Sequence, residues 1–190
     1  MNTSSKDYML VNLSYIKTNI KHFIKYANLA YERLKFSHGN DVSSTKFYRY
    51  YNCMGLLFGS THYYKMFKDI FKIIRKYSKS KKPLWFLCWL NIHTKDEVLK
   101  WHNHIDTLYH GYISIDPKNT ETVFDNYTIK NKTGNVYIGP SYRYHKVVNK
   151  KPYDDKRITI AFDVIDEKTI KKLYKTYGEV DVNLSFLPVY

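Results

Sequence analysis

Side chains that can bind a metal ion recur in one short stretch of this sequence and once more downstream. His102, His104 and Asp106 alternate within residues 101–106, and His145 follows later in the chain. In a β-strand, alternate residues point to the same face, so the first three side chains would face one cavity. Two imidazoles and a carboxylate that converge on one point, with coordination positions left open, are typical of non-haem Fe(II) centres that activate O2. The spacing therefore predicts an iron site.

The set of ligands beside His145 can be completed in two ways. Pairing His104 with Asp106 gives two histidines and one carboxylate, the arrangement expected of Fe(II) oxygenases. Pairing His102 with His104 gives a three-histidine site, in which Asp106 would hold the outer nitrogen of a metal-bound imidazole. We favour the pair of His104 and Asp106, with the three-histidine site as the alternative.

A strictly alternating segment after His145 carries an arginine and a threonine. Within 157–164, one face holds Arg157 and Thr159 together with Ala161 and Asp163, and the other face is uniformly apolar. A guanidinium offers a planar fork to a carboxylate, and a neighbouring hydroxyl adds a further donor. Arg157 is therefore predicted to bind the far carboxylate of a co-substrate, with help from Thr159.

The elements that position these residues change from helices to strands along the chain. Apolar residues spaced three or four apart predict helices, and short alternating or apolar runs predict strands. The resulting fold class is α+β, with a double-stranded β-helix core (jelly-roll or cupin-like) braced by N-terminal helices. Residues 1–82 would form a basic helical extension that packs on a core of residues 83–190. The expected helices cover 13–35, 61–78 and 167–177, with a turn at Gly39-Asn40, and the expected strands cover 84–92, 112–116, 136–138, 157–164 and 180–187.

Composition excludes several classes of protein. The 190 residues are 44% hydrophobic and 17% aromatic, which indicates a packed domain rather than disorder. The sequence has no apolar run of about 18 residues and no signal-peptide pattern, so we expect no membrane segment and a cytoplasmic location. Cys53 and Cys88 are two isolated thiols without a CxxC motif, which suits a reducing compartment and excludes a cysteine-built zinc site.

The positive charge of the chain is concentrated in its first part. Residues 1–82 hold 16 Lys and Arg against 4 Asp and Glu, a net charge of +12. The net charge of the whole chain is +14. Such an excess would attract nucleic acid, an anionic surface or an acidic protein. The plainer interpretation, in which lysines only solvate helix faces, is favoured.

Several short motifs together resemble a known family. They resemble the 2-oxoglutarate- and Fe(II)-dependent oxygenases related to prolyl hydroxylases that are common in marine bacteria and their phages. The resemblance covers residues 84–165, and residues 1–80 lie outside it. The motifs are Trp89-Leu90-Asn91, Trp101–His104, Gly111-Tyr112, Gly134–Ser141 followed by His145-Lys146-Val147, and Arg157-x-Thr159.

The resemblance implies a set of cofactors and a reaction. Fe(II), 2-oxoglutarate and O2 would be used to hydroxylate a C–H bond, with succinate and CO2 as co-products. His145 would be the distal metal ligand, Arg157 and Thr159 would bind 2-oxoglutarate, and Asn91 and Tyr112 would line its pocket. The primary substrate is left open among peptides, nucleic acids and small metabolites, anionic ones included.

Two departures from the family pattern affect the site. Many relatives have a proline directly after the second histidine of His-x-His, where this chain has Ile105-Asp106, so the third ligand stays open. Relatives usually have serine where this chain has His110, which adds this histidine as a candidate site residue. The competing functions are a cupin-like isomerase or non-catalytic binder on the same fold, and a basic nucleic-acid-binding protein.

Overall fold

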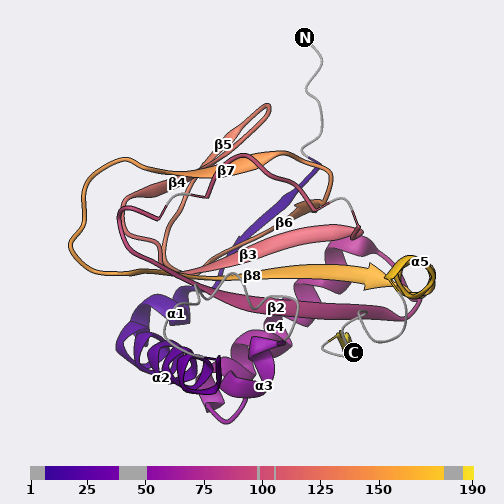
Figure 1. Ribbon diagram of the computed structural model, residues 1–190, viewed down its shortest axis with the longest axis horizontal. Helices are drawn as coiled ribbons and strands as arrows, with labels where there is room; N and C mark the ends of the chain where they lie inside the picture. Colours follow the sequence, from indigo (N-terminus) through magenta and orange to yellow (C-terminus); the bar gives the residue numbers. More distant parts are fainter. Residues whose placement is uncertain (1–6, 39–50, 98, 105, 178–185) are drawn as a thin grey trace.

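Two antiparallel β-sheets face each other in the computed structural model, which describes residues 7–38, 51–97, 99–104, 106–177 and 186–190. Short strands alternate between the two sheets along the chain, which makes the core a double-stranded β-helix, as expected (Figure 1). The main sheet has the order β1 (Met9–Asn12), β6 (Asn135–Pro140), β3 (Tyr109–Asp116), β8 (Arg157–Asp166), β2 (Leu84–His93) and β9 (Leu187–Pro188). The smaller sheet has the order β5 (Thr128–Lys130), β4 (Thr120–Phe124) and β7 (His145–Asn149).

Four helices cover the outer face of the main sheet, and a fifth follows β8 at one end of it (Figure 1). The helix expected over 13–35 is two helices, because the Asn19 side chain donates to the Tyr15 carbonyl, 2.9 Å away, and competes with the helical pattern. None of the described helices is long and apolar enough to cross a bilayer. The helices are α1 (Ser14–Thr18), α2 (Ile20–His38), α3 (Cys53–Leu57), α4 (Thr61–Ser78) and α5 (Glu167–Tyr177).

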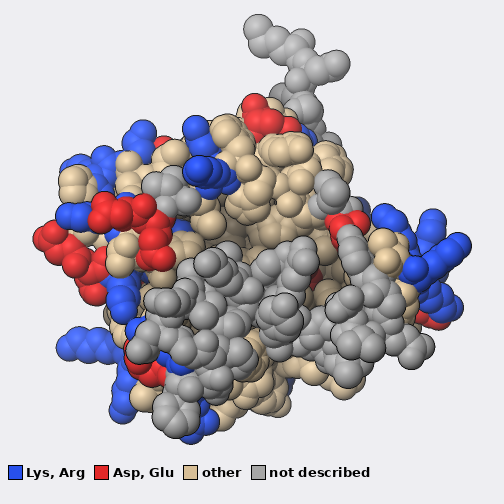
Figure 2. All heavy atoms as spheres, in the orientation of Figure 1, with Lys and Arg blue, Asp and Glu red and all other residues tan. Residues whose placement is uncertain are grey.

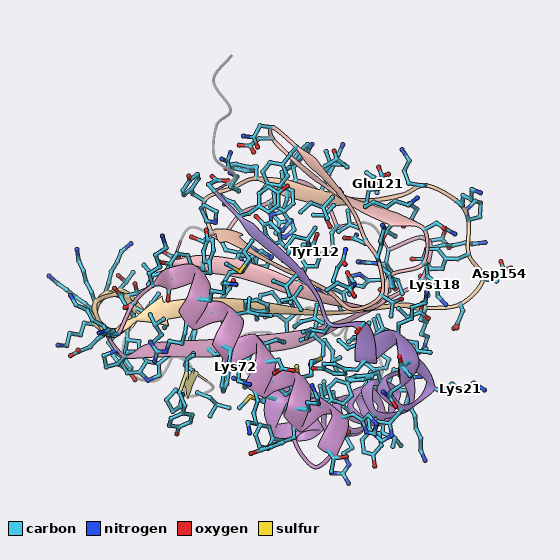
Figure 3. The ribbon with its side chains drawn as sticks, turned by 180° about the vertical axis from the view of Figure 1, so that it is seen from behind. Lys21, Lys72, Tyr112, Lys118, Glu121 and Asp154 are labelled. Carbon is cyan, nitrogen blue, oxygen red and sulfur yellow. The ribbon has the colours of Figure 1, made fainter. Side chains whose placement is uncertain are left out.

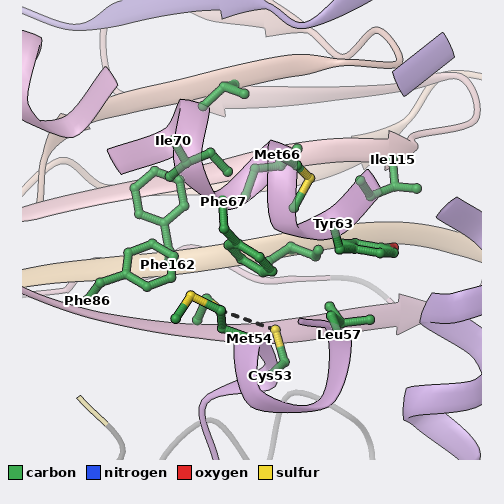
Figure 4. Close-up of a cluster of buried hydrophobic side chains, with 14 of the residues drawn as sticks. Cys53, Met54, Leu57, Tyr63, Met66, Phe67, Ile70, Phe86, Ile115 and Phe162 are labelled. Carbon is green, nitrogen blue, oxygen red and sulfur yellow. Dashed lines mark hydrogen bonds between the residues drawn. The ribbon is translucent and has the colours of Figure 1, made fainter. Parts of the chain in front are cut away.

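The helices and the main sheet share one apolar core (Figure 4). Phe67 of α4 meets Phe86 of β2 with ring centroids 6.2 Å apart, and Phe86 meets Phe162 of β8 at 5.4 Å. Gly111 on β3 leaves room for the Phe162 ring, which a Cβ at that position would approach to 2.1 Å. Residues from both predicted parts of the chain thus build this core, and β1 places an N-terminal segment in the main sheet. The division at residue 82 stays a prediction.

The two cysteines lie in this core and are closer than the sequence indicated. Cys53 and Cys88 are both free and buried, and their sulfur atoms are 3.3 Å apart. Burial raises the pKa of the Cys88 thiol well above its ordinary value, which keeps it protonated.

Residues 101–106 differ from the extended strand that their alternation predicted. Among the described residues of this segment, only His102 pairs with a strand, through an isolated bridge to His145. A turn follows, in which the Thr107 amide donates to the His104 carbonyl over 3.2 Å. The expected turn at Gly39-Asn40 and most of the strand expected over 180–187 lie outside the described residues.

The inner face of the main sheet is polar where the outer face is apolar. The alternation predicted for 157–164 is confirmed: the outward side chains of β8 join the core, and Arg157, Thr159, Ala161 and Asp163 face inward. The registers with β2 and β3 set His93 opposite Arg157, and both Asn91 and Ser114 opposite Thr159. A row of polar side chains therefore lines the space between the sheets.

Candidate functional site

Three histidines from two distant segments meet between the sheets. One side-chain atom of each of His102, His104 and His145 lies within 4.8 Å of the others. The backbone holds the segments together: His102 and His145 exchange two hydrogen bonds of 3.0 and 2.9 Å, and the His104 amide donates to the Ser141 carbonyl at 2.9 Å. The predicted approach of His104 to His145 is thus present in the structure.

The hydrogen bonds of these histidines define which nitrogen each one presents. The Nδ1 atoms of His102 and His145 lie 2.8 Å from the Lys100 carbonyl and 3.2 Å from the Arg143 carbonyl. Because a carbonyl oxygen only accepts, each Nδ1 donates, and each Nε2 carries a free lone pair. His104 donates from Nδ1 to Asp163 over 3.2 Å, and its buried Nε2 has no hydrogen-bond partner. The donor set is three Nε2 atoms, oriented as metal ligands usually are.

Burial keeps His102 and His145 neutral. It lowers the pKa of His145 to about 2, with further contributions from His110 and His102, and it also lowers the pKa of His102. A metal ion needs the neutral imidazole, so the electrostatics of the apoprotein already favour the binding form.

A buried carboxylate on β8 supports the cluster from behind. Asp163 accepts from His104 through one oxygen and from His110 through the other, at 3.2 and 3.0 Å. Burial alone would raise the pKa of Asp163, but its two histidine partners outweigh burial and hold that pKa well below its usual range. His104 and His110 stack with ring centroids 3.7 Å apart, and His104, His110 and Asp163 form a second group that could hold a metal ion. Asp163 thus fills the supporting role that the three-histidine alternative gave to Asp106.

The structure does not bring Asp106 to the histidines. Its side chain is 42% exposed and lies 3.6 Å from the ammonium group of Lys172 on α5. The turn after His104 ends the alternation that would have kept Asp106 on the same face. Of the two predicted ligand sets, the geometry therefore supports the three-histidine arrangement rather than the favoured pairing of His104 with Asp106, and the identity of the ligands stays a prediction.

Arg157 lies deep in the space between the sheets, with 3% of its surface exposed. Its guanidinium lies 2.7 Å from His93 Nδ1 and donates to the Thr159 hydroxyl at 3.3 Å. Burial lowers the pKa of Arg157, and it also lowers that of His93, to about 4, with the arginine contributing. Among the residues that the structure describes, no carboxylate lies within 4.0 Å of this guanidinium. In the described part of the chain, this buried positive charge therefore has no carboxylate within ion-pair distance, and the more distant charge of Glu97 does not outweigh burial.

Further polar groups line the same space. The hydroxyls of Tyr112 and Ser114 are buried without a hydrogen-bond partner. Tyr112, labelled in Figure 3, packs in a small cluster with Tyr137 and Phe124. This cluster spans the gap between the two sheets. Asn91 is buried beside Thr159 in the sheet register. The four residues predicted to bind the co-substrate thus lie on neighbouring strands of the main sheet, and Ser114, which pairs with Thr159, is added to them.

Sequence reasoning missed Asp163 and His93 as site residues and left His110 only as a candidate. A signal was present for Asp163, because it shares the polar face of an alternating strand with Arg157. His93 ends an apolar run, and only the antiparallel register with β8 sets it opposite Arg157.

Comparisons with known proteins agree on the fold. No protein-family model and no curated protein matches the sequence. Among solved structures, the non-heme alpha ketoglutarate dependent carbocyclase SnoK from nogalamycin biosynthesis is similar with a TM-score of 0.61 and 8% identity, over 84% of this chain and 79% of that one. The epimerase SnoN in complex with Fe3+, alpha ketoglutarate and nogalamycin RO gives 0.56 and 10%, over 84% and 79%. Apo HygX from Streptomyces hygroscopicus gives 0.56 and 10%, over 85% and 83%. The chain thus has the double-stranded β-helix fold, with a histidine cluster between its sheets.

Proposed function

We propose that this chain is an Fe(II)- and 2-oxoglutarate-dependent oxygenase. The observation that carries the proposal is the buried guanidinium of Arg157, which lacks a carboxylate among the described residues and lines the same space as three histidines. A charge buried without a counter-ion is costly, so a ligand that supplies a carboxylate at this point is strongly favoured. Imidazole ligands alone suit several transition metals, and it is the arginine that favours a keto-acid partner.

His102, His104 and His145 would hold the iron through Nε2, with Asp163 fixing the orientation of His104. The buried charges support the choice of co-substrate. A dianion such as 2-oxoglutarate can place one carboxylate at the buried guanidinium of Arg157 and its other carboxylate at the metal held by the histidines. When bound, the iron and the keto acid supply the activation of O2 that oxidises a C–H bond.

Arg157 and Thr159 would bind the far carboxylate of 2-oxoglutarate through the guanidinium fork and the hydroxyl. The unpartnered hydroxyls of Tyr112 and Ser114, and the Asn91 amide, would complete its pocket. The solved structures named above support this class of chemistry and include an epimerase and a carbocyclase. Hydroxylation of the substrate, as the family resemblance implies, is the outcome that we propose for this chain.

Anaerobic calorimetry with Mn(II) or Fe(II) and 2-oxoglutarate, followed by a succinate assay in air, tests the proposal. We expect each ligand to tighten binding of the other, because the dianion balances the metal charge. His145→Ala should abolish metal binding, whereas His22→Ala on the helical layer should leave it unchanged. Metal binding without any effect of 2-oxoglutarate on affinity, and without succinate formation, would instead indicate a cupin-type protein of another function.

A further inference from the structure

Exposed aromatic side chains flank the histidine cluster on both of its backbone segments. Trp101 precedes His102 and is 47% exposed, while Tyr142 and Tyr144 precede His145 and are 61% and 53% exposed. Large aromatic side chains are seldom left in solvent without a binding role when they gather at one place. The two segments lie side by side, because the Asn103 amide group donates to the Tyr142 carbonyl at 3.3 Å. We call Trp101, Tyr142 and Tyr144 the aromatic rim.

Cationic groups already pack on these rings. The Lys146 ammonium lies 5.0 Å from the centre of the Trp101 ring. The Arg143 guanidinium lies 5.8 Å from the centre of the Tyr142 ring, but it is already paired with Asp7 and Asp125, so Lys146 is the cation available here. Cations and flat rings at one site provide two kinds of contact, one for charge and one for stacking.

A stripe of lysines on α5 borders the same segment. Lys168, Lys171, Lys172 and Lys175 are spaced three and four apart, so they lie along one face of the helix, and all four are exposed. Lys172 reaches Asp106, two residues beyond His104, at 3.6 Å, which places the stripe beside the site. Figure 2 shows positive side chains gathered over α5 at one end of the molecule.

Little negative charge offsets this lysine stripe. In the described part of the chain, its ion pairs are those of Lys171 with Glu167 at 2.6 Å and of Lys172 with Asp106. Both pairs are largely exposed, and exposed pairs are weak enough for a polyanion to compete with them. The stripe is thus complementary to a chain of phosphates.

We propose that the substrate of this site is a single-stranded nucleic acid, an inference that rests on the proposed function. Its phosphates would contact the lysine stripe of α5, and its unpaired bases would stack on the aromatic rim and so reach the histidine cluster. Single strands are bound in this way because every base has a flat face, whereas the bases of a duplex are not available to stack. An acidic peptide would use the lysines but not the rings.

Fluorescence anisotropy with labelled oligonucleotides of about 16 nucleotides tests the proposal, a length matched to typical single-strand sites. The probes are mixed-sequence single-stranded DNA, the same sequence as single-stranded RNA, the DNA duplex and polyglutamate. We expect the single strands to bind at least about tenfold more tightly than the duplex or polyglutamate, with affinity that falls linearly in log–log plots against salt. Comparing the DNA with the RNA identifies the sugar that is preferred.

Variants separate stacking from charge. Trp101→Leu keeps apolar bulk but removes the ring, so it should weaken single-strand binding about tenfold, and Trp101→Phe should restore most of it. The double change Lys168→Gln and Lys175→Gln should reduce the salt slope by about 1.4, since each phosphate contact on a single strand contributes about 0.7. The matched double change Lys21→Gln and Lys72→Gln, on the helical layer (Figure 3), should leave the slope unchanged.

Two results would overturn the proposal: single strands binding no more tightly than duplex and polyglutamate, or the Lys21 and Lys72 pair lowering the slope as much as the α5 pair. The succinate assay keeps the two proposals apart. Oligonucleotide binding without any 2-oxoglutarate turnover would contradict the proposed function, whereas turnover without oligonucleotide binding would contradict only the substrate.

Discussion

The two faces of the main sheet are built from alternate residues of the same strands, yet one face is apolar and packs against helices while the other carries charged and polar groups. On β8, Phe162 packs outward against Phe86 of β2, and its neighbour Asp163 points inward to two histidines. The outer face stabilises the fold by burying apolar surface. The inner face buries charged and polar groups, which cost stability unless a partner satisfies them.

This difference separates stability from chemistry within one element. The inner groups are held rigidly because the outer groups pack, and the residues of the inner face can be chosen for what they bind. A period of two along the strand is what makes the separation possible. Substitutions on the outer face should therefore lower stability, whereas substitutions on the inner face should lower ligand or metal affinity.

Phe162→Ala should produce the largest loss of stability. The ring is fully buried and fits over Gly111, so its removal leaves a cavity that the strands cannot close. We expect the free energy of unfolding to fall by about 3–5 kcal/mol, as measured by urea denaturation. Metal affinity at a temperature where the variant is still folded should change little. A fall in metal affinity larger than that of an inner-face variant would contradict the separate roles of the two faces.

Arg157→Leu on the inner face should lower ligand affinity without lowering stability. The buried guanidinium has no carboxylate partner in the described structure, so the apoprotein should be as stable as the natural one, or more so. Affinity for 2-oxoglutarate in the presence of Mn(II) should fall about 10- to 100-fold, since hydrogen bonds to charged groups contribute about 1.5–3 kcal/mol. Calorimetry and urea denaturation on the same protein measure both effects. Loss of stability in the apoprotein would show that the arginine is a structural residue.

Asp163→Asn should affect the metal rather than the co-substrate. The amide keeps the shape of the side chain but no longer accepts at both oxygens from His104 and His110. Loss of a group that orients a metal-bound histidine typically lowers affinity about 10- to 100-fold. Competition with a fluorescent chelator measures the change, and Asp106→Asn is the matched control. If Asp106→Asn lowers the affinity as much, Asp106 is a ligand after all.

Local patterns predicted a large part of this fold. The helix expected over 61–78 begins and ends where α4 does, because its apolar spacing is regular and Ser60 caps its start. The alternating strand over 157–164 was predicted together with the direction of each side chain. In both segments the local periodicity and the tertiary packing agree, so the sequence alone contains the answer.

The site was less predictable because its geometry is set by contacts between distant segments. Asp106 was expected to follow His104 on a strand, and a turn stabilised by Thr107 removes it. Asp163 is set opposite His110 by the pairing of β8 with β3, and it reaches His104 through the segment that precedes β3. The short strands β4, β5 and β7 carry weak local signals and are fixed by pairing with one another, which no single segment shows.

Thr159→Val should have the smallest effect of these substitutions, a modest loss of affinity for 2-oxoglutarate. Valine has nearly the same shape, so it removes the hydroxyl that accepts from Arg157 while leaving the strand intact. A single hydrogen bond contributes about 0.5–1.5 kcal/mol, so affinity for 2-oxoglutarate should fall about two- to tenfold and metal affinity should not change. Ile160→Val removes one methylene from the outer face and is the matched control, which should lower stability by about 0.5–1.5 kcal/mol without changing 2-oxoglutarate affinity. If both variants lowered stability alone, or both lowered 2-oxoglutarate affinity alone, the two faces would not have separate roles.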